Sequence, residues 1–141
     1  MLLVSVIIFL RYRGRSSIAP LIVCFSEIII ILGIASLIKW DLDLASIAGI
    51  LAAIGTGVDD QIVILDEARH KEDSANIKQK IKRAFVIIMG AYFVGLVSLL
   101  PLLWAGAGLL KGFAVTTIIG ISVGVFITRP AFADIIKIIE K

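Results

Sequence analysis

Residues 44–65 read LASIAGILAAIGTGVDDQIVIL, an apolar run that carries two adjacent acids, Asp59 and Asp60, and no other charge. A stretch of about 20 apolar residues is long enough to cross a hydrocarbon core of about 30 Å as a helix. Ionised carboxylates at membrane depth cost several kcal/mol unless they face a bundle interior, a water path or a partner. The sequence therefore predicts a membrane span, and the acid pair is its strongest indication of function.

The composition extends this prediction to the whole chain. Of 141 residues, 60% are hydrophobic and 18% are charged, and the mean hydropathy is +1.07; soluble domains are only about 45–50% apolar. The apolar segments are continuous rather than alternating, which argues against a β-barrel. We therefore expect an all-α, polytopic transmembrane helical bundle. The net charge of +3 reports topology here, and the chain lacks the mixture of aromatic and basic residues typical of nucleic-acid binding.

One partial span and four full spans are predicted. Residues 2–10 are apolar but reach only about half of the hydrocarbon core, at about 1.5 Å per residue. Arg11 and Arg13 follow this stretch rather than precede it, which argues against a signal peptide. We therefore expect a fragment that begins inside a helix. The full spans are expected at residues 18–38, 44–65, 84–104 and 110–127.

Two short turns and one long loop connect these spans. Residues 39–43 (KWDLD) place Trp40 at interface depth and offer Asp41 or Asp43 as a helix cap. Residues 105–108 (AGAG) form the last hairpin, and the polar loop covers residues 66–83. Its second half, residues 76–83 (NIKQKIKR), predicts either a short basic helix along the membrane surface or a solvated connector.

Lys and Arg are distributed unequally between the two sides of the predicted bundle. Residues 11–15 carry three, the loop six and the C-terminal tail three, whereas the opposite side has only Lys39 and Lys111. Basic residues accumulate on the cytoplasmic side of a membrane protein. We therefore expect the loop and the C-terminus in the cytoplasm, the N-terminus outside, and a location in the plasma membrane. Arg129, at the end of the last span, is expected to be a cytoplasmic anchor.

Asp59 and Asp60 are expected to be sheltered by protein. Successive residues of a helix point about 100° apart, so the two side chains must face different neighbours, one in the local bundle and one in a partner subunit. We expect the pair to titrate as a coupled unit, and a proton gained or lost to shift helix packing, as in a proton relay. The alternative is a pair fixed by hydrogen bonds without proton transfer. Small residues that allow close helix approach precede the pair: Gly49, Ala52, Ala53, Gly55, Thr56 and Gly57.

Other polar residues are weaker candidates. Glu27 is a third acid inside a span, and either pairs with the acid-bearing helix or faces a lumen. Thr116 either bonds to the acids, directly or through water, or bonds back to its own helix carbonyls. His70 lies in the polar loop and lacks the spacing of a zinc site. The sequence offers no nucleophile–base arrangement and no phosphate loop, so we expect no enzyme, no metal and no cofactor.

Four stretches of the chain resemble the SecD branch of the SecD/SecF protein-export family, which lies within the wider resistance-nodulation-division (RND) group. They are GVDDQIVILDEAR (57–69), KRAF (82–85), KGFAVT (111–116) and ITR (127–129). In this resemblance Asp59 matches an aspartate implicated in proton transport, Asp60 falls where SecF-type sequences carry their acid, and Gln61 replaces a usual Asn. Residues 90–95 (GAYFVG) stand where bacterial members carry Asp-Ala-Asn-Val-Thr-Thr, and this departure is similar to archaeal members.

The resemblance implies a fold and a function. The chain would be the transmembrane domain of a SecD-like subunit, half of an RND-type repeat, over residues 1–141. It would be an accessory subunit of the Sec translocase, coupling a proton gradient to protein export through Asp59 and Asp60, with Glu27, Gln61 and Thr116 in supporting roles. Its expected partners are a SecF-like subunit, the SecY complex, membrane lipids and, through an external domain that is absent here, exported polypeptides.

Two other functions remain open on the sequence alone. The first is a fragment of an RND-type, proton-coupled exporter of lipids or small molecules, which shares acids in the middle of its spans. The second is a structural membrane subunit without ion chemistry, in which the acids only fix helix packing.

Overall fold

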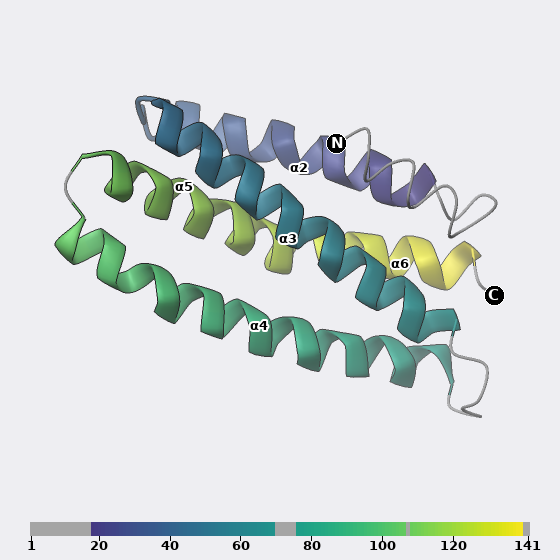
Figure 1. Ribbon diagram of the computed structural model, residues 1–141. Coiled ribbons are helices and arrows are strands. Elements are labelled where there is room, and N and C mark those ends of the chain that lie inside the picture. Colours follow the sequence, from purple (N-terminus) through teal and green to yellow (C-terminus); the bar gives the residue numbers. More distant parts are fainter. Residues whose placement is uncertain (1–17, 70–75, 107, 140–141) are drawn as a thin grey trace.

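A computed structural model describes residues 18–69, 76–106 and 108–139. Within these ranges the chain forms helices and no strands, in an elongated bundle (Figure 1). The elements are α2 (Ile18–Leu37), α3 (Leu44–Arg69), α4 (Ile77–Ala105), α5 (Leu109–Val123), a π-helical turn η2 (Gly124–Thr128) and α6 (Arg129–Ile139). Four helical segments are long and apolar enough to cross a membrane: Ile18–Leu37, Leu44–Arg69, Ile77–Trp104 and Leu109–Ile139. The predicted all-α transmembrane bundle is confirmed, whereas the predicted partial span at residues 2–10 lies outside the described residues.

The centre of the bundle is the contact between α3 and α5, the most extensive helix pair in the fold. Small residues bring the two backbones together, as expected for membrane helices. A Cβ atom at Gly49 would lie 2.6 Å from the carbonyl oxygen of Phe113, and one at Gly120 would lie 2.3 Å from Cβ of Ala53. Thr116 and Thr117 then donate across this contact, to the carbonyls of Ser46 at 3.0 Å and Gly49 at 3.3 Å.

Asp43 caps α3. Its Oδ1 accepts a hydrogen bond of 2.7 Å from the backbone N–H of Ser46, three residues on, which is the usual geometry of an N-terminal cap. Of the two acids that the sequence predicts as possible caps, Asp41 and Asp43, it is therefore Asp43 that caps α3. The preceding turn is fixed by backbone hydrogen bonds from Lys39, which has a φ of 52°, and from Trp40 to the last turn of α2.

We expect Asp43→Ala to lower the unfolding midpoint, because the first turn of α3 loses its cap. The hydrogen bonds from Ser46 lower the pKa of Asp43 below its ordinary value of 3.8. The stabilisation is therefore complete above pH 3.8 and is lost as the pH falls through the lower, folded-state pKa. Unfolding of wild type and Asp43→Ala, measured at neutral and strongly acidic pH, checks this: the difference between them must shrink in acid. Asp43→Asn, which keeps a capping oxygen, should behave like wild type at neutral pH.

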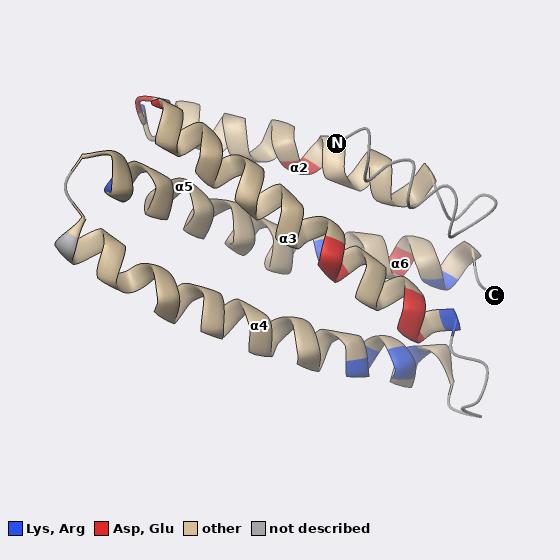
Figure 2. Ribbon diagram, in the orientation of Figure 1, with Lys and Arg blue, Asp and Glu red and all other residues tan. Residues whose placement is uncertain are grey.

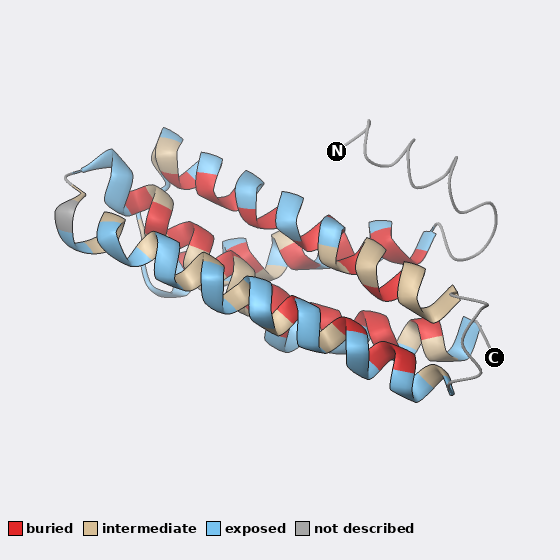
Figure 3. Cartoon of the chain, turned by 60° about the horizontal axis from the view of Figure 1, so that its bottom comes forward, coloured by how far each residue is buried: buried red, intermediate tan, exposed pale blue. Residues whose placement is uncertain are grey.

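Helix α4 lies along one side of the bundle and leaves most of its surface exposed, as the pale blue bands along it show (Figure 3). It begins at Ile77, so the basic segment 76–83 is neither a separate surface helix nor a connector but the first two turns of this span. Ile81 and Ala84 are buried there, and Ile77 packs against the same core. The exposed apolar side chains of α4, such as Phe93 and Val97, suit contact with lipid.

The last span does not end at residue 127. Gly124–Thr128 forms a π turn in which the N–H of Arg129 donates to the carbonyl of Gly124, five residues back, and α6 continues to Ile139. Proline has no N–H to donate and clashes with the preceding turn of an α-helix. The wider turn places Pro130 at the start of α6, where a proline is tolerated. Such π turns often occur at functional sites.

The charged residues gather at one end of the bundle, at the start of α4 and the end of α3 (Figure 2). Glu67 and Arg83 lie 4.0 Å apart there and join α3 to α4. The opposite end carries the turn with Lys39 and the first turn of α5 with Lys111. Among the described residues, Lys and Arg therefore lie at the two ends of the bundle to which the sequence assigns them, with the exception of Arg129.

Candidate functional site

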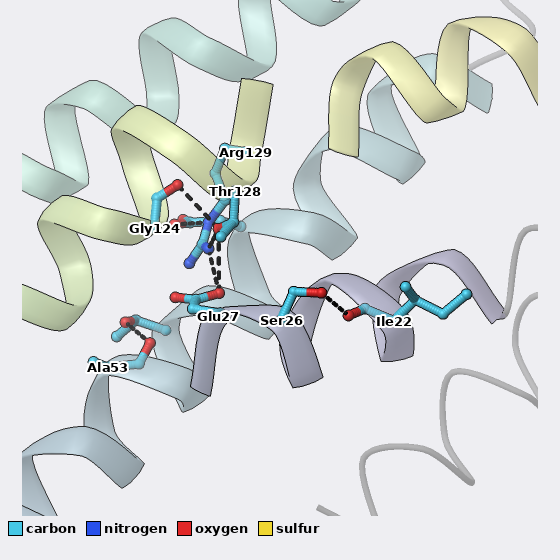
Figure 4. Close-up of polar contacts among 9 residues, drawn as sticks. Ile22, Ser26, Glu27, Ala53, Gly124, Thr128 and Arg129 are labelled. Carbon is cyan, nitrogen blue, oxygen red and sulfur yellow. Dashed lines mark hydrogen bonds and ion pairs between the residues drawn. The ribbon is translucent and has the colours of Figure 1, made fainter. Parts of the chain in front are cut away.

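Arg129 lies at the centre of a buried ion-pair cluster. Its Nη1 is 2.7 Å from Oε2 of Glu27 on α2, and its Nε is 3.2 Å from Oδ2 of Asp60 on α3. The side chains of Arg129 and Glu27 are each 1% exposed and that of Asp60 is 19% exposed. Figure 4 shows Arg129 reaching toward Glu27 from the start of α6. The guanidinium therefore links three membrane helices.

Thr128 completes the cluster. Its Oγ1 is 3.2 Å from Oε2 of Glu27 and 3.1 Å from the carbonyl oxygen of Gly124, and it also contacts Nη1 of Arg129 (Figure 4). Because residues 124–128 form a π turn, Thr128 and Arg129 both reach the interior although they are adjacent in sequence. The irregular turn at Pro130 is thus what presents these two side chains to Glu27.

Two glycines make room for the guanidinium. A Cβ atom at Gly57 would lie 2.5 Å from Nη2 of Arg129 and 3.2 Å from both carboxylate oxygens of Glu27. At Gly124 it would lie 2.8 Å from the same nitrogen. Any side chain at either position would have to displace the Arg129 side chain. The small residues of α3 therefore serve the charged cluster as well as helix packing.

The cluster holds two carboxylates and one guanidinium, so it carries a net charge of −1 when all three are ionised. Ionised groups out of water are stable only when paired and hydrogen-bonded. One proton on either acid would make the cluster neutral. The arrangement can therefore exchange one proton, and the exchange would change the attraction that holds α2, α3 and the last span together.

The structure separates the residues that the sequence grouped. Asp60 and Glu27 belong to the cluster, whereas Asp59 is exposed on another face of α3. Thr116 lies far from the acids: its hydroxyl bonds to the carbonyls of Gly112, at 2.9 Å, and of Ser46, fourteen residues before Asp60. The expectation that Asp59 and Asp60 face different neighbours agrees with this placement, and so does back-bonding by Thr116.

Gln61 is fully buried, and neither of its amide atoms has a hydrogen-bond partner among the described residues; the same holds for Oε1 of Glu27. A buried polar group without a partner costs about 1–3 kcal/mol. We therefore expect Gln61→Met, which keeps the length of the side chain, to change the free energy of unfolding by less than about 1 kcal/mol or to raise it. Denaturant unfolding in detergent checks this. A loss larger than that would mean that Gln61 is bonded, through water, to groups such as Glu27.

Arg129 and Thr128 were not predicted from the sequence as members of the site. The prediction that Arg129 is a cytoplasmic anchor is wrong, because its side chain is buried and paired with two acids. A signal was present: three acids lie inside spans, so at least one cation at membrane depth was needed to pair with them. Within the part of the chain that the structure describes, no cluster of side chains suits a metal ion, and the loop that contains His70 lies outside it.

Comparison with known proteins gives the family of this chain. The family model described as the C-terminal part of protein export membrane protein SecD/SecF matches residues 1–138. The chain is 56% identical over 135 residues to the protein-export membrane protein SecD of Methanocaldococcus jannaschii, covering 95% of this chain and 34% of that protein. It is 49% identical over 140 residues to SecD of Thermococcus gammatolerans, covering 95% of this chain and 27% of that protein.

Another relative is less similar. The protein translocase subunit SecD of Endomicrobium trichonymphae is 33% identical over 129 residues, covering 88% of this chain and 27% of that protein. The chain thus spans only about a third, or less, of the length of these relatives. On the matches over almost its whole length, this chain belongs to the SecD/SecF family of protein-export membrane proteins.

Proposed function

We propose that this chain is the membrane-embedded part of a SecD-like accessory subunit of the Sec translocase, and that it couples proton movement to protein export. The observation that carries the proposal is the buried cluster in which Arg129 pairs with both Glu27 and Asp60. The cluster holds two acids for one base. The second acid leaves a site at which a proton can bind and leave without an unpaired cation at membrane depth.

The proposed cycle begins with the pair of Asp60 and Arg129. When Asp60 takes up a proton, its attraction to the guanidinium falls, and Arg129 is held by Glu27 and Thr128 alone. The contact of α3 with the last span is then weakened, whereas that of α2 with the last span is kept. Loss of the proton restores the first contact. The relative movement of α3 and α6 is the step that an external domain of the full-length protein would convert into work on the exported polypeptide.

Asp59 has a different place in this proposal. It is exposed on a face of α3 whose neighbours are small, including Ala52, Gly55 and Thr56. A Cβ atom at Gly55 would meet nothing within 4 Å in this chain. Small residues on an exposed face let another membrane helix approach closely. We infer that a SecF-like subunit packs here and brings a group to Asp59, so that Asp59 belongs to the interface between the two subunits.

We also infer how the bundle is oriented in the membrane. The end of the bundle rich in Lys and Arg, with residues 66–83, lies in the cytoplasm, and the turn at residues 39–43 lies outside. Asp60 then lies about 25 Å from the outer end of α3, at 1.5 Å per residue, which is nearer the cytoplasmic face.

We expect Asp60→Asn, in the full-length protein with its partner subunit in membrane vesicles, to lower proton-gradient-stimulated export by about 100-fold. Asp59→Asn tests the role of the neighbouring acid, Asp59, in the same assay. Asp134→Asn is the matched control, because Asp134 is a 71% exposed acid of α6 that pairs with Lys137. If proton flux and export are unchanged in both Asp59→Asn and Asp60→Asn, the acids are structural and the proposal fails.

A further inference from the structure

A groove of about 360 Å³ lies on the surface of α4, in the first turns of the helix. The side chains that line it are those of Gln79, Lys82, Arg83 and Val86. Their spacing of three, four and seven residues from Gln79 places them on one face of the helix. Two are cations, one is an amide and none is an acid, so the groove offers several hydrogen-bond donors to an anion.

The positive charge of this groove is only partly neutralised. Glu67 of α3 lies 4.0 Å from Nη1 of Arg83 and offsets part of its charge, although the side chain of Arg83 remains 56% exposed. Lys82 is exposed and forms no ion pair with any described residue, and the same holds for Lys78, one turn before it. Lys78 and Lys82 therefore leave positive charge at the groove that Glu67 does not balance.

Beyond the groove, toward the middle of α4, the same face is apolar and exposed. Val86 is 68% exposed, and Phe93 and Val97 follow it at 58% and 65%. Gly90 lies between Val86 and Phe93 on this face, and a Cβ atom there would meet nothing within 4 Å. Because Gly90 has no side chain, it leaves room beside the helix for an extended hydrocarbon chain.

The side chains of this face favour lipid over another protein helix. Interfaces between membrane helices are rich in small residues, as α3 is around Gly55, whereas α4 presents mainly large apolar side chains here. The change from cations to apolar side chains takes place between Arg83 and Val86, which is about 4.5 Å at 1.5 Å per residue. The blue bands at the start of α4 accordingly give way to tan (Figure 2). A phospholipid changes from a charged headgroup to hydrocarbon over a similarly short distance.

We propose that this groove is a binding site for an anionic phospholipid. Lys82, Arg83 and the amide of Gln79 hold the phosphate, since cationic donors make short, strong hydrogen bonds to phosphate oxygens. One hydrocarbon chain of the lipid lies along α4 from Val86 past Gly90. The bound lipid fixes the first turns of α4 at the membrane surface, and its binding does not depend on the proton chemistry of the buried cluster.

Photocrosslinking of the full-length protein tests the site directly. The protein carries benzoylphenylalanine in place of Val86, in vesicles of equal parts phosphatidylglycerol and phosphatidylcholine, and mass spectrometry identifies what the probe captures. We expect phosphatidylglycerol to be captured in about tenfold excess, because each nearby cation favours the anionic lipid. The same probe in place of Leu100 is the matched control. Leu100 is 52% exposed on the same helix, about 21 Å farther along it, and should capture the two lipids equally.

A variant identifies the cation that selects the lipid. Lys82→Gln, which keeps a donor but removes the charge, is expected to lower the excess of phosphatidylglycerol at residue 86 about fivefold. Lys111→Gln, at an exposed lysine of the opposite end of the bundle, should leave the excess unchanged. Arg83 is kept in both variants because it joins α3 to α4 through Glu67.

Two results would overturn the proposal, and both are read from the protein that carries the probe at residue 86 with all its cations in place. Equal capture of the two lipids there would show that the groove does not select an anionic headgroup. Capture of a protein chain instead of lipid would show that this face of α4 is an interface between subunits. Neither result would bear on the proton coupling proposed for Asp60, which is measured by flux and export.

Discussion

Arg129→Met is expected to lower the free energy of unfolding by about 3–5 kcal/mol, the cost of leaving a buried ionic partner unpaired. The substitution removes the only group that pairs with both Glu27 and Asp60 among the described residues. The two acids are then left as like charges inside the bundle, unless they take up protons. Thermal or denaturant unfolding of the full-length protein in detergent measures the loss.

The matched control is Lys137→Met. Lys137 makes an ion pair of the same length, 2.7 Å, with Asp134, but the two side chains are 37% and 71% exposed. Exposed pairs contribute about 0–1 kcal/mol, so the change should be small. A rescue experiment adds Glu27→Gln and Asp60→Asn to Arg129→Met, because a buried cluster replaced by neutral groups is often no less stable. Equal effects of Arg129→Met and Lys137→Met would contradict the assigned role of Arg129.

The spans were predictable because they follow from hydropathy and length alone. Ile18–Leu37 and the start of α3 at Leu44 agree with prediction to within one residue. The errors are at the end of the bundle that is rich in Lys and Arg, where α3, α4 and the last span each continue into polar sequence. The apolar stretch of sequence ends where the chain leaves the hydrocarbon. The helix itself continues beyond that point because side chains such as Ile81 and Phe132 still pack against the core of the bundle.

The site was predictable only in part. A charge inside an apolar run is visible in sequence, so Asp60 and Glu27 could be found. Their partner could not, because Arg129 stands beside Pro130 at the apparent end of a span, where an arginine usually reaches the interface. Its burial depends on the π turn at Gly124–Thr128 and on the space left by Gly57, and neither appears in a pattern of hydropathy.

Two glycines on α3 should respond to alanine with opposite signs. A Cβ atom at Gly57 would lie 2.5 Å from Nη2 of Arg129, whereas one at Gly55 would meet nothing within 4 Å. Alanine is about 1 kcal/mol more favourable than glycine inside a helix. Gly55→Ala is therefore expected to raise the free energy of unfolding by up to about 1 kcal/mol. Gly57→Ala is expected to lower it by about 1–3 kcal/mol, because the guanidinium must move out of its optimal position between Glu27 and Asp60.

The comparison is best made by unfolding the full-length protein in detergent without its partner subunit, so that an interface on the face of Gly55 does not contribute. Gly33→Ala, at an exposed position of α2 with no atom within 4 Å of its Cβ, is a second control and should behave like Gly55→Ala. If Gly57→Ala were as stable as Gly55→Ala, Arg129 could leave Glu27 at little cost. The ion pairs would then not hold the last span in place, and protonation of Asp60 would have no rigid contact to release.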